Sequence, residues 1–260
     1  SIKKLGPGQA MWVRDGVIVE DFVWYRLPVF RASHTSRKQL NSNQQTKSNS
    51  IDGVEKHLRQ AVHRQMVSDV PVGAFLSGGL DSSAVVTFAR EINPDIDCFT
   101  IDISGGTDTG TVDDLPFARQ VAEHLKVKLE VVSIKASDMA MDLEAMVSHL
   151  DEPLADPAAL NVLYISQLAR ESGIKVLLSG VGGDDLFTGY RRHRALKFEH
   201  FWTGLPLSAR KGLQSLSSKL DKRTSVGRRL SKLFDGASLE GDARLVNYFV
   251  WSRREDLEAL

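Results

Sequence analysis

Short apolar runs alternate with helical patterns through the middle of this 260-residue chain. The runs that read as strands lie at 72–76, 97–103, 129–134 and 175–179. Helical stretches separate them near 82–92, 114–125, 137–150 and 157–171. This alternation is typical of βαβ units, so we expect a doubly wound α/β fold: a parallel sheet of about five strands with helices on both faces. In such sheets, ligands bind at the loops that follow the strands.

The composition fits a soluble chain with one sizeable core. Hydrophobic residues make up 42% of it, which suits a core domain of roughly 150–200 residues plus a smaller appendage. The 33 basic and 33 acidic side chains cancel, so no overall field attracts nucleic acid. No apolar run approaches the ~20 residues that a membrane span requires. The opening "SIKKLGPGQAMWV" lacks the apolar core of a secretory signal, so we expect a cytoplasmic protein without nucleic-acid or membrane partners.

The single cysteine, Cys98, lies in the apolar run between Ile96 and Ile101 and cannot form an intrachain disulfide. A free cysteine in such a run is usually a small buried hydrophobe rather than a nucleophile. We therefore expect Cys98 to have a packing role.

The first fifty residues do not follow the strand–helix alternation. Residues 10–25 favour a short β-hairpin, because the Asp-Gly pair within them tolerates the positive φ of a tight turn. Residues 31–50 carry only two hydrophobic side chains, which is typical of a linker. Apolar residues then recur at helical spacing from Ile51, which predicts an amphipathic helix that ends before Pro71.

Beyond Tyr190 the sequence becomes polar, basic and helical, most clearly over residues 209–234. A cationic stripe there could grip phosphate or RNA, but on a chain of zero net charge we favour a solvated helical face. The nearby "TGYRRHR" carries Arg191, Arg192 and Arg194, which could face an anionic substrate or lie on the surface.

The stretch "FLSGGLDSSAVV", at residues 75–86, connects one expected strand to the next helix. Its turn, Ser77 to Ser83, combines two glycines with three hydroxyls. Glycines let the backbone approach an anion closely, the helix N-terminus adds partial positive charge, and backbone N–H groups and hydroxyls donate hydrogen bonds. This combination predicts a turn that binds phosphate.

Asp81 is the unusual member of this turn, because a carboxylate repels phosphate unless a divalent cation such as Mg²⁺ bridges them. The turn is not a P-loop, since the Gly-Lys-Ser/Thr ending is absent, and it lacks the Gly-x-Gly-x-x-Gly dinucleotide fingerprint. A glycine turn capped by serine would explain Ser77 to Gly79. It would not explain an aspartate followed by two serines.

The turn "SGGLDSS" resembles the pyrophosphate-binding loop of the N-type ATP pyrophosphatases, which split ATP between its α- and β-phosphates. Three further stretches narrow the resemblance to the glutamine-hydrolysing asparagine synthetase family: "VDDLPFARQVAEHL" at 112–125, "DEPLADPAALNVLYISQLAR" at 151–170 and "VLLSGVGGDDLFTGYRRHR" at 176–194. Their order and spacing match the family over about residues 51–200. The resemblance implies an adenine nucleotide alpha hydrolase-like fold.

The resemblance also implies a division of the chain. Residues 1–30 resemble the last strands of a glutaminase (Ntn-type) domain, of which the hairpin is a remnant, and residues 31–50 are the linker. Residues 51–260 then form the ATP-pyrophosphatase synthetase domain, which we expect to be truncated at its C-terminus. The family hydrolyses glutamine with an N-terminal cysteine, whereas this sequence opens with Ser1, so we do not expect that half-reaction here.

The implied activity is that of an ATP-dependent carbon–nitrogen ligase. A carboxylate, normally the aspartate side chain, attacks the α-phosphate of ATP to give an aspartyl-adenylate and pyrophosphate. Ammonia from glutamine then displaces AMP to give asparagine. The implied cofactors are ATP and Mg²⁺, and the implied partners are small-molecule substrates: ATP, aspartate and ammonia. A homodimer is one of the assemblies left open.

Carried onto this sequence, the family's motifs imply ten residues that bind ATP: Leu76, Ser77, Gly78, Gly79, Asp81, Ser82, Ser83, Ile101, Ser179 and Gly180. Asp81 and Asp184 match two carboxylates that bind Mg²⁺ from separate loops. The "GGDD" that contains Asp184 could instead be a turn that caps the following helix, but Asp185 can serve there, so we favour a metal-binding role for Asp184.

Two departures from the family bear on catalysis. Val181 replaces an acidic residue that assists ammonia attack, and a valine cannot accept a proton. The family's lysine for the adenylate-forming step belongs downstream of Leu260, so no catalytic residue is assigned. We therefore expect binding of ATP–Mg with poor turnover. Two alternatives stay open: an amidotransferase or ring-closing relative that acts on another carboxylate, and a non-catalytic nucleotide-binding module.

Glu152 and Asp156 flank prolines in "DEPLADPAAL". They could form a substrate-side loop, but we favour a proline-stiffened helix start in which Asp156 is the N-cap.

Overall fold

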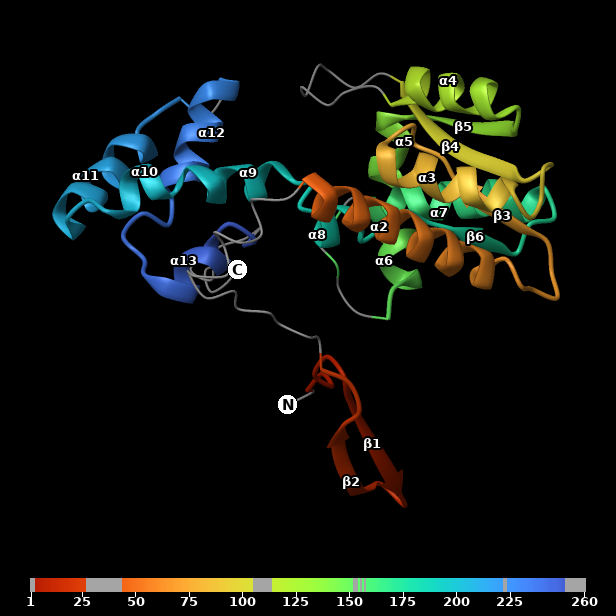
Figure 1. The fold of residues 1–260 in the computed structure, drawn as a ribbon, viewed down its shortest axis with the longest axis horizontal. Coiled ribbons are helices and arrows are strands. Elements are labelled where there is room, and N and C mark those ends of the chain that lie inside the picture. Colours follow the sequence, from red (N-terminus) through yellow and green to blue (C-terminus); the bar gives the residue numbers. More distant parts are fainter. Residues whose placement is uncertain are drawn as a thin grey trace. The chain divides into compact units, whose positions relative to one another are not determined.

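The computed structural model describes residues 3–26, 44–104, 114–151, 154, 156, 158–221 and 224–250 (Figure 1). The chain divides into two compact units, Ser1–Leu58 and Arg59–Leu260. Within the described ranges, no helix combines the length and the apolar character needed to cross a membrane.

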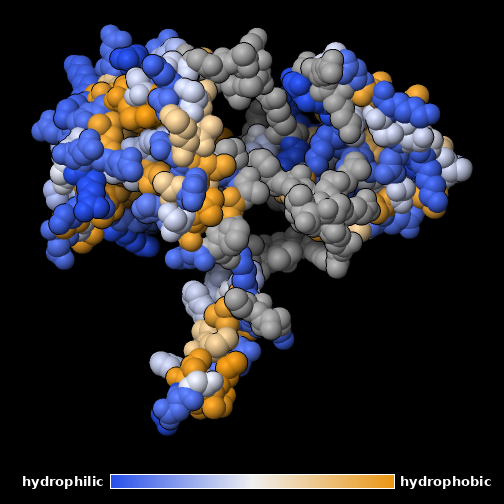
Figure 2. Space-filling view, turned by 180° about the vertical axis from the view of Figure 1, so that it is seen from behind, coloured by the Kyte–Doolittle hydropathy of each residue, from blue (hydrophilic) through white to orange (hydrophobic). Residues whose placement is uncertain are grey.

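The first unit contains a two-stranded antiparallel sheet of β1 (Gln9–Arg14) and β2 (Val17–Val23). Asp15 and Gly16 form its turn with φ values of 52° and 75°, which confirms the predicted hairpin. Apolar side chains on both strands are exposed, as Figure 2 shows for this segment, and Trp12 retains 65% of its accessible surface. Two strands alone do not bury the apolar faces of a sheet.

Helix α2 (Gln44–Gln65) begins earlier than its apolar pattern indicates. We placed the linker over 31–50 and the first helical residue at Ile51, whereas residues 44–50 are helical. Residues 27–43 of that linker lie outside the described residues. The early turns consist of polar residues, several of which are good helix formers, so they extend the helix without adding to its apolar face.

The second unit is built on a parallel sheet of β3 (Val72–Phe75), β4 (Asp97–Ser104), β5 (Lys128–Lys135) and β6 (Val176–Leu178). The strand order is β5-β4-β3-β6, and each neighbouring pair is parallel. The four strands lie where the apolar runs predicted them. We expected about five strands, and the described residues form four in this sheet.

Helices flank this sheet (Figure 1). Helix α3 (Leu80–Arg90) packs on β3, and both α4 (Leu115–Leu125) and α7 (Ala158–Glu171) pack on β4 and β5. Because β4 and β5 extend the sheet in one direction and β6 extends it in the other, right-handed crossovers place α3 and α4 on one face and α7 on the opposite face. The doubly wound arrangement predicted from the sequence is thereby confirmed.

One predicted helix is divided in two. The stretch 137–150 forms α5 (Ala136–Met141) and α6 (Leu143–His149), which Asp142 separates. The Asp142 carboxylate accepts a hydrogen bond of 2.6 Å from the hydroxyl of Tyr164 on α7. This bond ties the break between α5 and α6 to the helix that covers the sheet.

The core lies between the sheet and its helices. Phe99, on β4, is fully buried and packs with Ile165, Ala169 and Ile174 on the α7 side. Cys98, its neighbour, is also fully buried, and burial followed by the negative charge of Asp97 raises the pKa of the thiol to about 12. The packing role predicted for Cys98 is confirmed.

Beyond β6 the chain is helical: α8 (Gly183–Phe187), α9 (Arg191–Phe198), α10 (His200–Thr203), α11 (Leu207–Ser218), α12 (Ser225–Phe234) and α13 (Gly241–Asn247). Arg210 on α11 is buried, although it belongs to the basic stretch predicted to be solvated. Its guanidinium donates to the carbonyl oxygens of Ala237 and Leu239 and to the carboxylate of Glu240, at 3.3, 3.3 and 2.8 Å. This cation therefore holds the C-terminal helices together.

Candidate functional site

The strand order reverses at β3, which has β4 on one side and β6 on the other. Loops that follow the two neighbouring strands at such a reversal meet outside their carboxyl ends. The loops after β3 and β6 do so and line a cavity of about 570 Å³. That volume lies within the range of small-molecule sites. The topology therefore builds a ligand cavity from the two loops that the sequence singles out.

The loop after β3 starts as a continuation of the sheet. The Leu76 N–H donates to the Phe99 carbonyl at 2.9 Å, and the Leu76 side chain is buried. The chain then turns at Gly78, whose φ is +74°. A side chain here would overlap the backbone of Phe117 and Ala118 in the first turn of α4. Glycine is required at Gly78 for both its φ and its space.

Hydroxyl groups fix the shape of this loop. Ser77 Oγ accepts from the Gly79 N–H at 3.3 Å and lies 3.0 Å from Ser82 Oγ. Ser83 Oγ donates to the Gly79 carbonyl at 2.7 Å. Gly79 is the N-cap residue of α3 and supplies no side-chain cap among the described residues. The N-terminus of α3 thus faces the cavity with its positive dipole end, as an anion site requires.

The loop after β6 passes directly against the first loop because it is rich in glycine. A Cβ added at Gly180 would lie 2.7 Å from the Ser82 nitrogen and 2.8 Å from the Asp81 carbonyl carbon. At Gly183 it would overlap the Asp81 carboxylate. Glycines at both positions therefore allow the second backbone to pack on Asp81.

Asp81 and Asp184 come together from these two loops. Burial, and then the negative charge of Asp184, raise the pKa of the Asp81 carboxyl, and a hydrogen bond from the Asp184 backbone partly offsets this. The two side chains are thus close enough for their negative charges to oppose each other. No cluster of three or more metal-ligating side chains occurs among the described residues. A cation held by this pair would need further oxygens from a ligand and water, which suits Mg²⁺.

Most of the predicted ligand-binding residues line the cavity: Ser77, Gly79, Asp81, Ser82, Ser179, Gly180 and Asp184. The other four do not. Leu76 and Gly78 lie beneath the loop and against α4, and Ser83 holds the Gly79 carbonyl from the first turn of α3. Ile101 lies on β4 and packs against the α7 side of the core.

The sequence reasoning missed several apolar side chains that line the same cavity: Phe75, Leu80, Val162, Phe187 and Tyr190. Val162 gave no local sequence signal, because it is one of several exposed positions on α7, whose buried residues are Leu160, Tyr164, Ile165 and Ala169. Val181 also lines the cavity, retains 92% of its exposure and donates its N–H to Ser179 Oγ at 3.2 Å. The cavity thus joins a polar floor to a partly exposed apolar rim.

Asp156 behaves as a helix cap. Its side chain accepts from the Ala158 N–H at 2.9 Å at the start of α7, in agreement with the role that we favoured. Glu152 lies outside the described residues. Asp185 is exposed in the first turn of α8, where the N-cap residue is Gly182 and no side-chain cap is formed.

Arg192 and Arg194 do not line this cavity. Arg192 stacks on the ring of Tyr190, with its guanidinium carbon 4.1 Å from the ring centroid. The side chain of Arg191 lies outside the described residues.

The family model and two curated relatives that match this chain support the same family. The family model described as asparagine synthase matches residues 53–249. Asparagine synthetase [glutamine-hydrolyzing] 1 of Bacillus subtilis is 34% identical over 209 residues, which cover 78% of this chain and 30% of that protein. A putative asparagine synthetase of Mycobacterium bovis is 31% identical over 249 residues, which cover 94% of this chain and 35% of that protein.

Two further matches are more distant. Amidase chyE of Penicillium rubens is 30% identical over 186 residues, which cover 65% of this chain and 27% of that protein. An NH3-dependent NAD synthetase structure from Campylobacter jejuni matches with a TM-score of 0.36 and 10% identity, over 78% of this chain and 98% of that chain. The chain spans about a third of the length of the curated relatives that it matches.

Proposed function

Because this chain belongs to the asparagine synthase family, we propose that residues 51–260 form an ATP-dependent domain that activates a carboxylate for amide formation. The observation that carries the proposal is the meeting of Asp81 with Asp184 beside the glycine-rich turn before α3. A phosphate site and a pair of acidic side chains are useful together only when a cation links phosphate to carboxylate.

Different residues of the two loops would bind different parts of ATP. Backbone N–H groups at the start of α3 and the hydroxyl of Ser77 would hold the pyrophosphate portion. The loop at Ser179 and Gly180 would close the other side of the cavity. This arrangement would fix the α-phosphate relative to the acceptor, which is the main requirement for phosphoryl and nucleotidyl transfer.

Asp81 and Asp184 are the residues that would hold Mg²⁺. The donor set fits, since both side chains are hard oxygen ligands whose repulsion a divalent cation would relieve. When bound, the cation neutralises charge on the phosphates. Asp81 and Asp184 would keep it on the cavity side of both loops, because the backbone at Gly183 packs directly on Asp81.

The acceptor that the family implies is aspartate. Its side-chain carboxylate would attack the α-phosphorus, the bond to the β-phosphate oxygen would break, and pyrophosphate would leave. Ammonia would then attack the acyl carbon of the adenylate, with release of AMP and a proton. We further propose that residues 1–30 are the end of the glutaminase domain that supplies this ammonia in the whole protein. That protein would be cytoplasmic and act on small molecules.

A second candidate function rests on Val181. This side chain lines the cavity, is almost fully exposed and cannot act as a base where the resembling family carries an acid. Leu80 and Phe187 extend the apolar rim beside it. These residues favour an acceptor larger and less polar than aspartate, with an amine nucleophile that needs no acidic partner.

Pyrophosphate release tests the proposal and separates the two candidates. The chain is incubated with ATP, Mg²⁺ and either aspartate or a panel of apolar carboxylates, with and without ammonium. We expect slow release of pyrophosphate that depends on a carboxylate and on Mg²⁺. Gly79→Asp is the matched control, because it adds a negative charge to the phosphate turn at a position with φ of −70°, where aspartate is a favoured N-cap. Equal release without any carboxylate, or from G79D, would contradict the proposal.

A further inference from the structure

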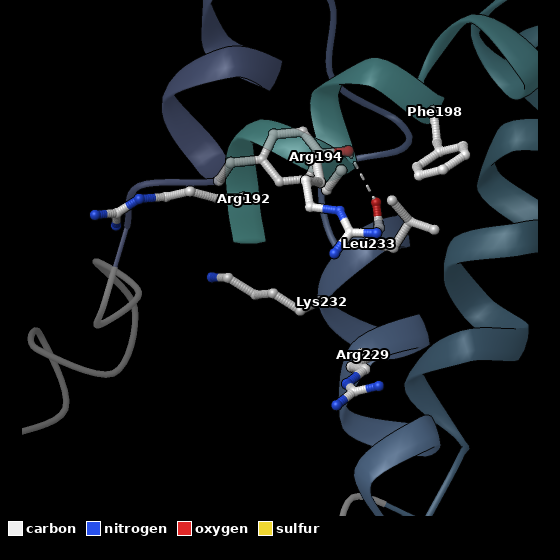
Figure 3. Close-up of a pocket in the computed structure, with 8 residues that line it drawn as sticks. Arg192, Arg194, Phe198, Arg229, Lys232 and Leu233 are labelled. Atoms are coloured by element: carbon white, nitrogen blue, oxygen red, sulfur yellow. Dashed lines mark hydrogen bonds between the residues drawn. The ribbon is translucent and has the colours of Figure 1, made fainter. Parts of the chain in front are cut away.

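A second cavity, of about 640 Å³, lies among the C-terminal helices (Figure 3). Its lining comes from α9, α12 and the residue that follows α13: Arg192, Arg194, Ala195, Phe198, Arg229, Lys232, Leu233 and Tyr248. We propose that this cavity binds a small anion that carries two or more phosphate groups, at a site separate from the ATP cavity. This inference goes beyond the proposed function and does not depend on it.

The lining is strongly cationic. Four of its side chains are arginine or lysine and none is acidic, although the whole chain carries 33 basic and 33 acidic residues. Glu199, the acid at the end of α9, is buried and paired with Arg244 at 3.0 Å, so its charge is already balanced. The cavity therefore concentrates positive charge that a singly charged carboxylate would leave largely uncompensated.

The cationic groups are also held in place and keep unused hydrogen-bond donors. The Arg192 guanidinium lies over the rings of Tyr190 and Phe249, at 4.1 and 4.8 Å, and its Nε is buried without a hydrogen-bond partner among the described residues. Lys232 uses one donor on the Val250 carbonyl at 3.0 Å, and an ammonium has three. Such stacked and anchored cations favour phosphate, whose oxygens match the guanidinium fork.

Figure 3 shows these side chains on two helices, with the Arg192 guanidinium extending away from Arg194 and Arg229. Arg229 and Lys232 project from α12, and Arg192 and Arg194 come from α9. Phe198 and Leu233 form apolar walls, and the Tyr248 hydroxyl is already used, since it donates to the Leu233 carbonyl at 3.1 Å. Polar recognition is thus left to the four cations.

A small ligand fits this geometry better than RNA. The basic stretch 209–234 does not form one continuous stripe, because Arg210 is buried and paired with Glu240. The volume of the cavity lies within the range of small-molecule sites. The basic residues of α12 that line it, Arg229 and Lys232, remain exposed enough to admit such a ligand from solvent.

Calorimetric titration of inorganic pyrophosphate into the 260-residue chain, in EDTA, tests this site. We expect the affinity for pyrophosphate to fall with added salt. We also expect it to be at least tenfold lower in R229A/K232A. R194Q, on the other helix, guards against a folding defect of the double variant and should weaken binding several-fold. Lys211→Ala is the matched control, since it removes an exposed lysine of α11 outside the cavity and should leave binding unchanged.

Two further titrations identify the class of ligand and distinguish binding at this cavity from binding at the phosphate turn before α3. ADP that binds more tightly than pyrophosphate would point to a nucleotide, and the reverse order to an inorganic polyphosphate. G79D, which blocks the phosphate turn before α3, should keep this binding. Loss of pyrophosphate binding in G79D with retention in R229A/K232A would overturn the proposal, as would the absence of binding in the folded wild type or a response to RNA alone.

Discussion

Replacing Gly180 by alanine tests how closely the two loops of the site approach each other. The added Cβ would lie 2.7 Å from the Ser82 nitrogen and 2.8 Å from the Asp81 carbonyl carbon. Both are backbone atoms, so no flexible side chain can move to relieve the contact. The β6 loop must therefore shift away from the phosphate turn, or the turn itself must deform.

The free-energy change for Gly180→Ala follows from two opposing contributions. Overpacking against backbone costs about 1–3 kcal/mol, and alanine recovers about 0.4–1 kcal/mol by restricting the unfolded chain. The net loss for Gly180→Ala is therefore about 1–2 kcal/mol. Gly78→Ala adds a left-handed φ, which costs about 1–2 kcal/mol more. We expect that variant to lose about 2–4 kcal/mol.

Urea unfolding monitored by tryptophan fluorescence measures these free energies. Gly212→Ala is the control, because this glycine lies within α11 with nothing within 4 Å of its added Cβ, so the variant should be up to about 1 kcal/mol more stable. If Gly180→Ala were as stable as Gly212→Ala, the two loops would not be in contact and the cavity would lose its second wall.

Three more outcomes are expected. Burial raises the pKa of Asp81 above its usual value of 3.8, so its stabilising contribution is lost as the pH rises from 3.8 through its folded-state pKa. The free energy of unfolding of the wild type should therefore fall relative to that of D81N over this range in the same denaturant series, and D81N should lose Mg²⁺-dependent ATP binding. Asp156→Ala should cost about 0.5–2 kcal/mol through loss of the α7 cap, whereas Asp151→Ala, which removes an exposed carboxylate before that helix, should change little in the same unfolding assay. Cys98 should react with iodoacetamide, followed by mass spectrometry, only after unfolding; rapid labelling of the native chain would contradict its burial.

Much of the fold could be predicted because its signals are local. Each strand of the second sheet is a short apolar run between helical patterns, and the hairpin turn is set by Asp15 and Gly16. The early start of α2 could not be predicted in this way, because residues 44–50 include no apolar residue. Apolar residues at helical spacing indicate a helix that buries one face, so a helical segment made only of polar residues gives no such pattern.

The polar lining of the cavity was predictable for a similar reason, since its residues lie on two short consecutive stretches, the loops after β3 and β6. The apolar rim was not, because Val162 lies on α7 and Phe187 ends α8, and only the fold brings these two helices to the cavity. The basic cavity escaped prediction as well. Arg192 and Lys232 are forty residues apart, and sequence reasoning judged their segments separately.

Calorimetric titration of ATP into the chain, with Mg²⁺ and with EDTA, tests the central claim that the turn before α3 and the Asp81–Asp184 pair form one ATP–Mg site. We predict micromolar binding that requires Mg²⁺ and that is lost in G79D, a variant whose fold should be preserved because aspartate suits the N-cap position. Undiminished binding in G79D, or no binding by a folded wild-type chain, would contradict the claim.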